Sequence, residues 1–420
     1  MRSSADYLQK IEEARRSGQL ERVVDLTKRA LKHHPSDVRL KAQYARDLHE
    51  VGRNAQALHI FDELIHEEPE NQQHLTAKGA VQIAIGQLDD ALENSLAATK
   101  KDPAGWLNVA RVYREQGKLE KARDALTQCI QKRPENILAR NALNMLLFDM
   151  DEFDEARIHG QRSLELKRQA SLKGFATLRR RLQLDLSDLE TDPGHQKIIA
   201  FSLWGDQYMY LQGAIENLKI APALFPGWRC RIYHDASVPG DVIERLDGMG
   251  AQLILVSGAL ANLHGGFWRF AVANDPTVER FIIRDADGRL NDRDATAVQA
   301  WVNSNQSFHV MRDHIYHTDL ILAGMWGGFA GTLPDLTTAG NALYGGQVSR
   351  WNDQLFLARV VWPLIENDCL VHDSYYHHLF NAQPFPPSPV RSDHNFIGRG
   401  LKIEGWMKTI KVPSAGRKPR

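Results

Sequence analysis

Two acidic residues, Asp285 and Asp287, are the strongest candidates for chemistry in this 420-residue chain. They follow the apolar residues 281–283, which are typical of a buried β-strand, and side chains two residues apart project to the same side of a strand. Two carboxylates about 5 Å apart repel by roughly 3 kcal/mol at an effective dielectric of about 20. Such a pair either shares a proton or holds a cation. A hard divalent ion with oxygen ligands, Mg2+ or Mn2+, is the natural occupant, and its usual task is to neutralise phosphates.

The second half of the chain alternates between short apolar strands and helical stretches. Strands are predicted at 197–202, 229–234, 252–256, 281–283 and 308–311, and helices at about 208–218, from 241 and from about 267. This alternation predicts a mostly parallel sheet with helices on both faces, whose ligands bind at the carboxyl ends of the strands. Asp285 and Asp287 lie at such an end. No glycine-rich dinucleotide motif or P-loop is present, which disfavours those two classes of nucleotide site.

The composition is that of a globular protein with room for two or three domains. Apolar residues make up 43%, and 52 basic residues balance 52 acidic ones, which argues against a nucleic-acid partner held by net charge. Cys129, Cys230 and Cys369 are far apart, so we expect buried, inert thiols in a reducing compartment. The first residues lack a signal sequence and no stretch approaches the ~20 apolar residues of a membrane span, so a cytoplasmic location is expected.

A repeat of about 34 residues occupies residues 1–168. Its markers, a glycine or an aspartate, are Gly18, Gly52, Gly86, Gly117 and Asp151. Five positions after each marker stands a small or β-branched residue: Val23, Ala57, Ala91, Ala122 and Ala156. Prolines follow the first four markers by 17 positions: Pro35, Pro69, Pro103 and Pro134. Small residues let two antiparallel helices approach closely, glycine permits the turn between them, and proline ends the second helix.

This pattern resembles the tetratricopeptide repeat, most clearly in one copy: Trp106, Ala110, Tyr113, Gly117, Ala122 and Pro134. About five such helix pairs would stack into a solenoid with a concave groove, which in this family binds a peptide or another protein. Arg46, Arg111 and Arg114 would line that groove and suit an acidic partner, or they are ordinary solvated arginines. Repeats of this kind also mediate self-association, so a homo-oligomer is an alternative of nearly equal weight. Residues 169–194, with a basic run at 179–181, are expected to form a capping or linker helix.

The motifs of the second half together resemble those of GT-A glycosyltransferases of the glycogenin-like and capsular-sugar types. They are Phe-Trp-Arg-Phe at 267–270, the Asp-x-Asp pair, Gly-Met-Trp-Gly at 324–327 and Asn-Asp-Gln at 352–354. More closely, the chain resembles a bacterial group that joins tetratricopeptide repeats to this domain, in which Arg-Asp-Ala-Asp is usually followed by serine. Gly288 takes that place here. The resemblance, over roughly 197–380, implies an α+β multidomain protein with a Rossmann-like, mostly parallel mixed sheet at 195–400. The composition of the last residues predicts a basic tail at 401–420.

The resemblance also implies a metal and a nucleotide sugar, with a UDP-sugar as the first expectation. Asp287 would be a direct ligand of Mn2+ or Mg2+, and Asp285 a metal or ribose contact. A metal acting as Lewis acid would stabilise the charge of the leaving nucleoside diphosphate. His372 fits the place of a third ligand, or it is a core histidine. Arg269 would meet the phosphates, or it forms a structural ion pair. Trp204 would stack on the base, or it is a core tryptophan.

Further residues are implied near the sugar and the acceptor. Arg312 would meet the donor sugar hydroxyls or the acceptor, and Gln354 would contact the sugar. Residues 324–328 are predicted to form a small-residue turn, in which the backbone at Gly324 approaches a ligand closely or the glycines only permit φ > 0. Asp353 is the first candidate for the base that removes the proton of the acceptor hydroxyl, and Asp313 is the second. Asp353 is equally well explained as a helix N-cap. Alternation along the strand points Arg284 to the opposite face from Asp285, where a structural salt bridge is expected.

The expected function is transfer of a sugar from a nucleotide sugar to a protein, peptide or glycan acceptor recruited by the repeats. One rival is a haloacid-dehalogenase-type phosphatase, in which Asp285 would be the nucleophile and Asp287 a general acid. That motif normally lies on the first strand of its domain, and no later lysine and acidic pair follow in the required order. The other rival is a repeat scaffold whose second domain is inactive.

Overall fold

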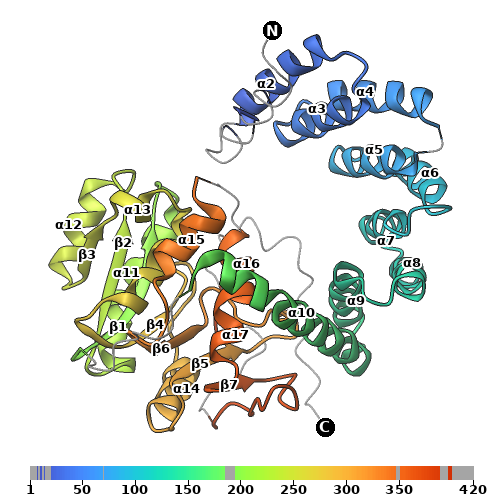
Figure 1. The fold of residues 1–420 in the computed structure, drawn as a ribbon. Coiled ribbons are helices and arrows are strands. Elements are labelled where there is room, and N and C mark those ends of the chain that lie inside the picture. The colour runs from blue at the N-terminus through green and yellow to red at the C-terminus, as the bar shows by residue number, and fades with distance from the viewer. Residues whose placement is uncertain are drawn as a thin grey trace.

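The computed structural model describes residues 20–69, 71–184, 194–346, 351–387 and 396–399, together with Tyr7, Lys10, Ile11 and Ala14. Within these residues the chain forms an arc of helices that continues into a domain built on one β-sheet (Figure 1). The predicted turn at Gly18 and the predicted basic tail at 401–420 lie outside the described residues.

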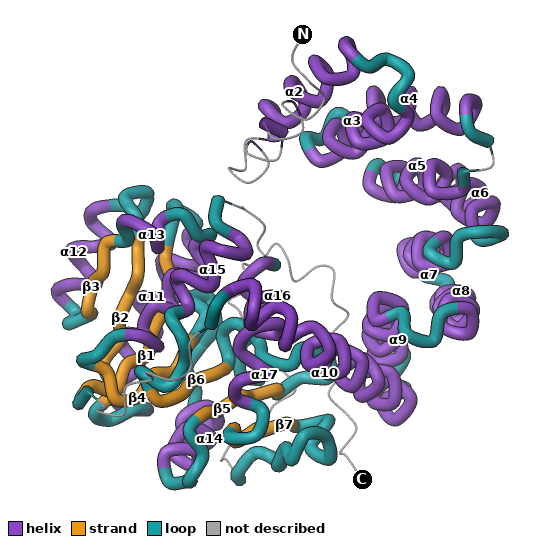
Figure 2. The backbone as a smooth tube through the Cα atoms, in the orientation of Figure 1, coloured by secondary structure: helices purple, strands orange, loops and turns teal. Residues whose placement is uncertain are grey.

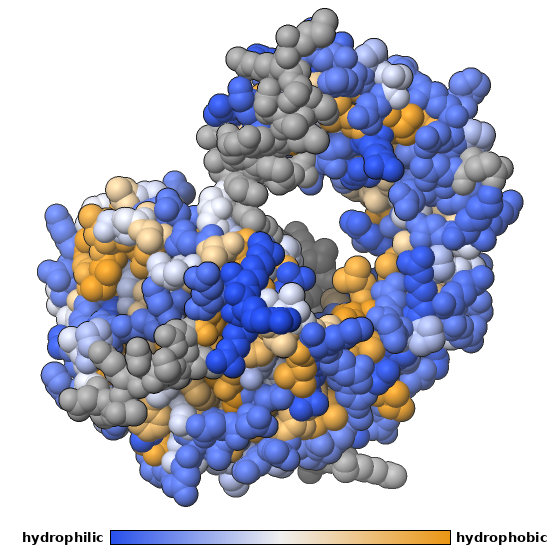
Figure 3. Space-filling view, in the orientation of Figure 1, coloured by the Kyte–Doolittle hydropathy of each residue, from blue (hydrophilic) through white to orange (hydrophobic). Residues whose placement is uncertain are grey.

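The arc consists of helices joined by short turns (Figure 2). They are α2 (Leu20–His33), α3 (Val38–Glu50), α4 (Asn54–Glu67), α5 (Gln72–Ala84), α6 (Leu88–Ala98), α7 (Gly105–Glu115), α8 (Leu119–Lys132), α9 (Ile137–Asp149) and α10 (Phe153–Leu182). Each helix packs on the next one in sequence. Figure 3 shows the outer surface of the arc as mostly hydrophilic, with an open hollow between it and the sheet domain.

The repeat markers do what their residue types predict. Gly52, Gly86 and Gly117 adopt φ of +78°, +79° and +71°, and Asp151 adopts +63°, each in the turn inside a helix pair. The small residue five positions later is buried in every copy, which lets the two helices of a pair approach closely. The prolines follow the ends of α2, α4, α6 and α8. The helical repeat region is therefore confirmed over the described residues.

The last repeat helix, α10, belongs to both parts of the molecule. It is one helix of 30 residues, whereas a separate capping or linker helix was expected at 169–194. It ends at Gln183, whose φ of +50° closes the helix with a left-handed residue. Its second half packs on η2 (Leu357–Val361) and α17 (Trp362–Ile365) of the sheet domain. One hydrophobic core runs from α7 through α10 into that domain, so the two parts are packed together rather than linked by a tether.

The domain is built on a seven-stranded mixed sheet in the described residues, with the order β3-β2-β1-β4-β6-β5-β7. The strands are β1 (Gln196–Leu203), β2 (Trp228–His234), β3 (Gln252–Leu255), β4 (Val278–Ile283), β5 (Phe308–Arg312), β6 (Trp326–Phe329) and β7 (Cys369–Asp373). All neighbours pair in parallel except β6, which is antiparallel to β4 and β5. The predicted mostly parallel sheet is thus present, and each strand predicted from the sequence overlaps an observed one.

Alternation along the strands sorts side chains into two cores. Ile198 and Ala200 of β1 pack with η1 (Gly265–Asn274), α15 (Leu336–Tyr344) and α10, while Ile199 and Phe201 pack with α11 (Tyr208–Leu224), α12 (Gly240–Gly248) and α14 (Asp292–Val302). The sheet is therefore covered on both faces, as expected for a parallel sheet. The helix predicted from about residue 267 is a 3-10 helix that begins at Gly265.

The glycine-rich stretch at 324–328 differs from expectation. The sequence predicts a small-residue turn there, but residues 326–329 form the antiparallel strand β6. A Cβ on Gly327 would lie 2.4 Å from the carbonyl oxygen of Phe281, and one on Gly328 would lie 2.5 Å from the ring of Phe308. These glycines are in a strand because neighbouring strands and rings leave no room for a side chain.

Candidate active site

The carboxyl ends of β1 and β4 meet in the middle of the sheet, where the strand order changes direction. From β1 the chain adds β2 and then β3 on one side, and later β4 on the other. A crevice outside such a reversal point is the usual ligand site of an open α/β sheet. Trp204 follows β1 directly, and Asp285 and Asp287 follow β4. The structure therefore brings together three residues that the sequence assigned to one site.

Arg269 lies between two of the candidate carboxylates. This buried arginine, on η1, places its Nη1 atom 2.5 Å from Oδ1 of Asp285 and its Nη2 atom 4.0 Å from Oδ2 of Asp353. The same Nη1 donates to the carbonyl oxygen of Arg284 at 2.9 Å. The Asp285 side chain remains 42% exposed despite this pair, so it keeps an open side toward solvent. Arg269 thus links the candidate metal carboxylate to the candidate base.

Asp287 has a carboxyl group whose charged form is disfavoured by its surroundings. Burial, together with the neighbouring Asp285 carboxylate, raises the pKa of Asp287 to about 6. A raised pKa of this origin means that a positive charge placed between the two groups would be stabilised. Within the described ranges, no three His, Cys, Asp or Glu side chains come together as a metal-binding group. The donor set at this turn is therefore a pair of carboxylates, which suits Mg2+ or Mn2+ with water and phosphate oxygens in the other positions.

Three residues that sequence reasoning missed hold the Asp-x-Asp turn in place. Asn217, fully buried on α11, donates to the carbonyl oxygen of Gly288 at 2.7 Å and accepts from the backbone N–H of Leu290 at 3.1 Å. Gly213 lies one helical turn earlier, and a Cβ there would be 2.0 Å from the carbonyl oxygen of Ala286. Arg289 donates back to the carbonyl oxygen of Gly213 at 3.3 Å. A polar residue on the apolar face of the helix at 208–224 was the signal that could have found Asn217.

Trp204 is an exposed aromatic group fixed on several sides. Its ring stacks at 20° on Tyr210 and makes edge contacts with His264 and Trp268. Gly265 touches the ring, because a Cβ there would lie 2.4 Å from Cε3 of the indole. The side chain nevertheless remains 39% exposed. It is therefore not a core tryptophan, and a flat ligand could stack on its open part.

Asp353 sits beside Arg269 at the start of α16 (Asn352–Phe356). Burial raises the pKa of this carboxyl group, while the Arg269 guanidinium opposes the rise. Its Oδ1 atom accepts from the backbone N–H of the next residue, Gln354, at 2.7 Å, and a Cβ on Gly266 would lie 2.6 Å from its Oδ2 atom. The position is compatible with the predicted base.

Gly324 and Gln354 shape the wall beside Asp285. A Cβ on Gly324 would lie 2.1 Å from Oδ2 of Asp285, so this glycine makes room for the carboxylate. Gln354 donates to the carbonyl oxygen of Ile321 at 2.6 Å and accepts from the N–H of Ala323 at 3.1 Å. Both ends of its amide are thus engaged with the loop before β6, and Gln354 supports this loop rather than offering a free amide to a sugar.

Arg284 lies on the opposite face from Asp285, as the strand alternation predicts. It forms a buried two-pronged ion pair with Asp294 of α14, with N to O distances of 2.8 and 2.6 Å. The salt bridge that the sequence predicted for Arg284 is confirmed.

Two other predicted site residues, Arg312 and Asp313, are part of the packed interior. Arg312 is fully buried and donates to Asp373, also fully buried, at 2.5 Å. Both oxygen atoms of Asp313 lie 3.0 Å from Nε of Arg293, and Ser374 and the N–H of Ile397 donate to this carboxylate as well.

Arg312 therefore does not face a donor sugar in this structure. Asp313, with both oxygens occupied, does not present a free base.

His372 is also turned away from the carboxylate pair. It lies on β7, three positions along the sheet from β4, and its Nδ1 atom is 2.8 Å from Nε2 of His309. Both rings are buried, and burial lowers the pKa of His372 to about 4. His372 is therefore a core histidine here, which was the alternative to its role as a third metal ligand.

No family model matches the chain, and no curated protein matches it. Part of the chain is similar to solved structures. MamA (residues 41 to the end) from Desulfovibrio magneticus RS-1 is 24% identical over 40% of this chain and 96% of its own, with a TM-score of 0.32. A thermophilic TPR protein in Thermus thermophilus is 22% identical over 39% and 91%, with a TM-score of 0.35. A tetratricopeptide repeat protein from Parabacteroides merdae ATCC 43184 is 19% identical over 43% and 75%, with a TM-score of 0.33. Each match leaves more than half of this chain without a counterpart.

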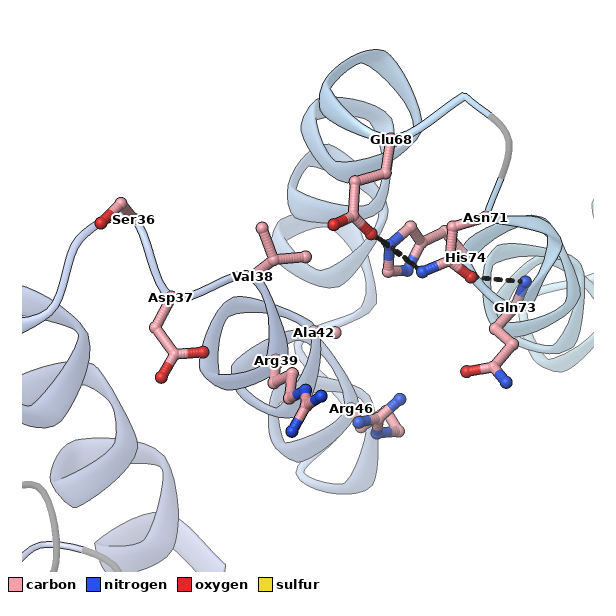
Figure 4. Close-up of a pocket in the computed structure, with 10 residues that line it drawn as sticks. All are labelled: Ser36, Asp37, Val38, Arg39, Ala42, Arg46, Glu68, Asn71, Gln73 and His74. Atoms are coloured by element: carbon pink, nitrogen blue, oxygen red, sulfur yellow. Dashed lines mark hydrogen bonds and ion pairs between the residues drawn. The ribbon is translucent and has the colours of Figure 1, made fainter.

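The repeat region has a groove of its own, about 880 Å3 in volume, between α3 and α5. Figure 4 shows Arg39 and Arg46 on one side of it and the bonded cluster of Glu68, Asn71 and His74 on the other. Glu68 accepts from Asn71 at 2.9 Å and lies 3.0 Å from Nε2 of His74. Of the three arginines predicted to line a groove, Arg46 does so here.

The other two arginines lie further along the arc. Arg114 pairs with Asp149 at 3.0 Å, and Asp149 also accepts from the Tyr316 hydroxyl of the sheet domain at 3.0 Å. Arg111 is exposed on α7. The three free cysteines are buried, as expected. None of the helices in the described ranges is both long and apolar enough to cross a membrane.

Proposed function

We propose that the protein is a metal-dependent glycosyltransferase that uses a nucleotide sugar. The observation that carries this proposal is the Asp285–Asp287 pair at the carboxyl end of β4, beside the buried Arg269 and at the reversal point of the sheet. The motif resemblance to GT-A enzymes supports the same assignment. Arg269 offers a fixed positive charge next to the place where a diphosphate would lie, and Trp204 offers an open aromatic face nearby for the base.

Asp285 and Asp287 would hold Mg2+ or Mn2+ through their carboxylate oxygens. The metal would supply Lewis-acid stabilisation of the leaving diphosphate. The Asn217 amide keeps the backbone of the Asp-x-Asp turn in place, which orients both carboxylates before any ligand arrives. Arg269 neutralises part of the charge of Asp285. This leaves Asp287 as the carboxylate with the strongest need for a cation.

Asp353 would take the proton of the acceptor hydroxyl. Burial raises the pKa of Asp353, which makes the carboxylate a better proton acceptor than a solvated aspartate, and Arg269 limits the rise. The acceptor would be a protein, a peptide or a glycan that the repeat region recruits. Arg39 and Arg46 on one side of the groove would suit an acidic group of that acceptor, although the groove is also lined by Asp37 and Glu68. A homo-oligomer through the repeats and a cytoplasmic location belong to the same proposal, the latter supported by three unpaired cysteines.

The deciding experiment is hydrolysis of a panel of UDP-, GDP- and CDP-sugars with and without Mn2+, together with calorimetric titration of the free nucleotides. We expect metal-dependent release of one nucleoside diphosphate by the wild type. Asp287→Ala should lose at least about 100-fold in rate, whereas Asp247→Ala, an exposed aspartate on α12, should match the wild type. Equal activity in Asp287→Ala would refute the metal role. Release of phosphate from simple phosphomonoesters would favour the phosphatase instead. The absence of hydrolysis of every donor in the panel would favour an inactive scaffold.

A further inference from the structure

The first turn of η1 separates the two halves of the candidate site. Gly265 touches the indole of Trp204, and a Cβ at this position would lie 2.4, 2.7 and 2.8 Å from three of its ring atoms. Gly266, the next residue, touches Asp353, and a Cβ there would lie 2.6 Å from Oδ2 and 3.2 Å from Cγ. Gly265 therefore contacts Trp204, the proposed stacking surface for the nucleotide base. The adjacent Gly266 contacts Asp353, the proposed general base.

The need for glycine at these two positions is one of space. Neither residue has a positive φ, so an alanine could adopt either backbone conformation. An added methyl group would instead force its neighbour to retreat. Contact at ordinary van der Waals distance would require a movement of about 1 Å at Trp204 and about 0.8 Å at Asp353.

The backbone of this turn is itself held firmly, so the neighbour has to move. The N–H of Gly266 donates to Nδ1 of His264 at 3.2 Å, and the N–H of Arg269 donates to the hydroxyl of Ser202 on β1 at 3.1 Å. Arg269 is further fixed by its contacts with Asp285 and with the carbonyl oxygen of Arg284. The same 3-10 helix thus touches Trp204, Asp353 and Asp285 through three of its residues.

We propose that Gly265 and Gly266 are positioning residues with separate tasks. Gly265 sets the place of the Trp204 indole and so acts on binding of the donor base, and Gly266 sets the place of the Asp353 carboxylate and so acts on proton removal from the acceptor. This inference rests on the proposed function and adds to it a division of the site along one helical turn. A misplacement of about 1 Å at a reacting group can cost on the order of 100-fold in rate, whereas a shifted stacking platform weakens binding.

The contacts are tested first by thermal unfolding, which does not depend on any activity. We expect Gly265→Ala and Gly266→Ala each to lower the unfolding midpoint by roughly 3 °C or more. The loss should largely vanish when the first is combined with Trp204→Ala and the second with Asp353→Ala. Gly240→Ala, at an open position with ordinary φ, is the matched control and should leave the midpoint unchanged.

Each outcome of this comparison of single and double variants decides whether the proposed contact exists. If Gly266→Ala does not fold but Gly266→Ala with Asp353→Ala does, the contact is supported. If both fail to fold, or if the loss is the same in both backgrounds, the methyl group meets something other than Asp353 and the inference is overturned. The same reasoning applies to Gly265 with Trp204.

The tasks are tested by steady-state kinetics with UDP-glucose and Mn2+, or with whichever donor of the panel the wild type hydrolyses, and by calorimetric titration of UDP. We expect Gly265→Ala to raise KM and the Kd of UDP about tenfold with kcat within about threefold of the wild type. We expect Gly266→Ala to lower kcat at least about tenfold with KM within about threefold. Identical effects of the two variants would overturn the division. A wild type without activity on any donor would refute the proposed function and with it the two tasks, while the unfolding cycle would still decide the contacts.

Discussion

The hydroxyl of Ser171 on α10 donates to the carbonyl oxygen of Ala358 in η2 at 2.6 Å. This bond joins the last helix of the repeat region to the helix that continues from Asp353. Two ion pairs also join α10 to the sheet domain, between Lys167 and Asp319 at 2.6 Å and between Arg168 and Glu366 at 2.8 Å. The repeat region therefore supports the back of the candidate site directly.

Pro363 explains why Ala358 needs a partner from outside its helix. Residues 357–361 are in π conformation, and the N–H of Trp362 donates to the carbonyl oxygen of Leu357, five residues earlier. The next bond of this kind would join residue 363 to Ala358, but proline has no N–H. The carbonyl of Ala358 is left free by its own helix, and Ser171 satisfies it.

Ser171→Ala should therefore destabilise the sheet domain. It leaves a partly buried carbonyl oxygen without this donor, which costs about 1 kcal/mol in the free energy of unfolding. Thr177→Ala, at an exposed position of the same helix, is the control and should change stability by less than about 0.5 kcal/mol. Urea unfolding followed by circular dichroism measures both. Equal stability of the two variants would contradict a structural role for the bond.

Asn217→Ala should loosen the Asp-x-Asp turn. The substitution removes a donor to Gly288 and an acceptor for Leu290 in a fully buried place, so we expect a loss of about 2–3 kcal/mol in the free energy of unfolding. If the turn carries a metal, the apparent Kd for Mn2+ should rise about tenfold as well. Asn217→Asp keeps the acceptor but loses the donor, and should fall between the wild type and the alanine variant. If the apparent Kd of Asn217→Ala for Mn2+ equals that of the wild type, the Asn217 hydrogen bonds do not orient the metal ligands.

Local patterns in the sequence were sufficient for the parts of the fold that depend on neighbours in the chain. Gly52 and Asp151 marked turns because a left-handed residue is needed between two close helices, and alternation alone placed Arg284 and Asp285 on opposite faces. The strand before Asp285 was recognisable because it ends in an unbroken apolar run.

The failures involve partners that are distant in the chain. Arg312 and Asp313 lie at the carboxyl end of a strand, as site residues often do, but the partner of Arg312 is Asp373, opposite it in the pairing of β5 with β7. That pairing is a matter of sheet register, which no local pattern contains. His372 was misplaced for the same reason, since it lies beside β5 and not beside β4.

Mild acid should destabilise the folded protein through its buried histidines. Burial lowers the pKa of His317 to about 3 and of His372 to about 4, and that of His309 falls well below its ordinary value of 6.5. The unfolded chain takes up these protons near pH 6.5 and the folded chain does not, so stability falls as pH drops below 6.5. Asp287, with its pKa of about 6, acts in the opposite direction below about pH 6.

These four groups together should lower the free energy of unfolding by about 3 kcal/mol between about pH 7.5 and about pH 5.5, from three histidines at about 1.4 kcal/mol each less about 1 kcal/mol from Asp287. Urea unfolding at the two pH values measures it. His317→Asn removes one of the three histidines, about 1.4 kcal/mol, and should reduce this loss by nearly half. A stability that stays constant over this range would show that the three rings accept protons in the folded state.

Gly288→Ser should be tolerated, although it changes the residue next to the candidate metal ligand. Gly288 does not have a positive φ, and an added Cβ would meet the carbonyl oxygen of Asp285 at 3.4 Å and Cα of Gly398 at 3.7 Å, which are ordinary contacts. We expect a free energy of unfolding equal to that of the wild type or higher by about 0.5 kcal/mol, because serine has less backbone freedom than glycine in the unfolded chain.

Gly213→Ser is the matched comparison on the other side of the same turn. A Cβ there would lie 2.0 Å from the carbonyl oxygen of Ala286, so this variant should lose several kcal/mol, on the order of other overpacked cores. The unfolding midpoints of the two serine variants, measured side by side, test this prediction. If Gly288→Ser is as unstable as Gly213→Ser, the turn is packed more tightly at residue 288 than these distances imply.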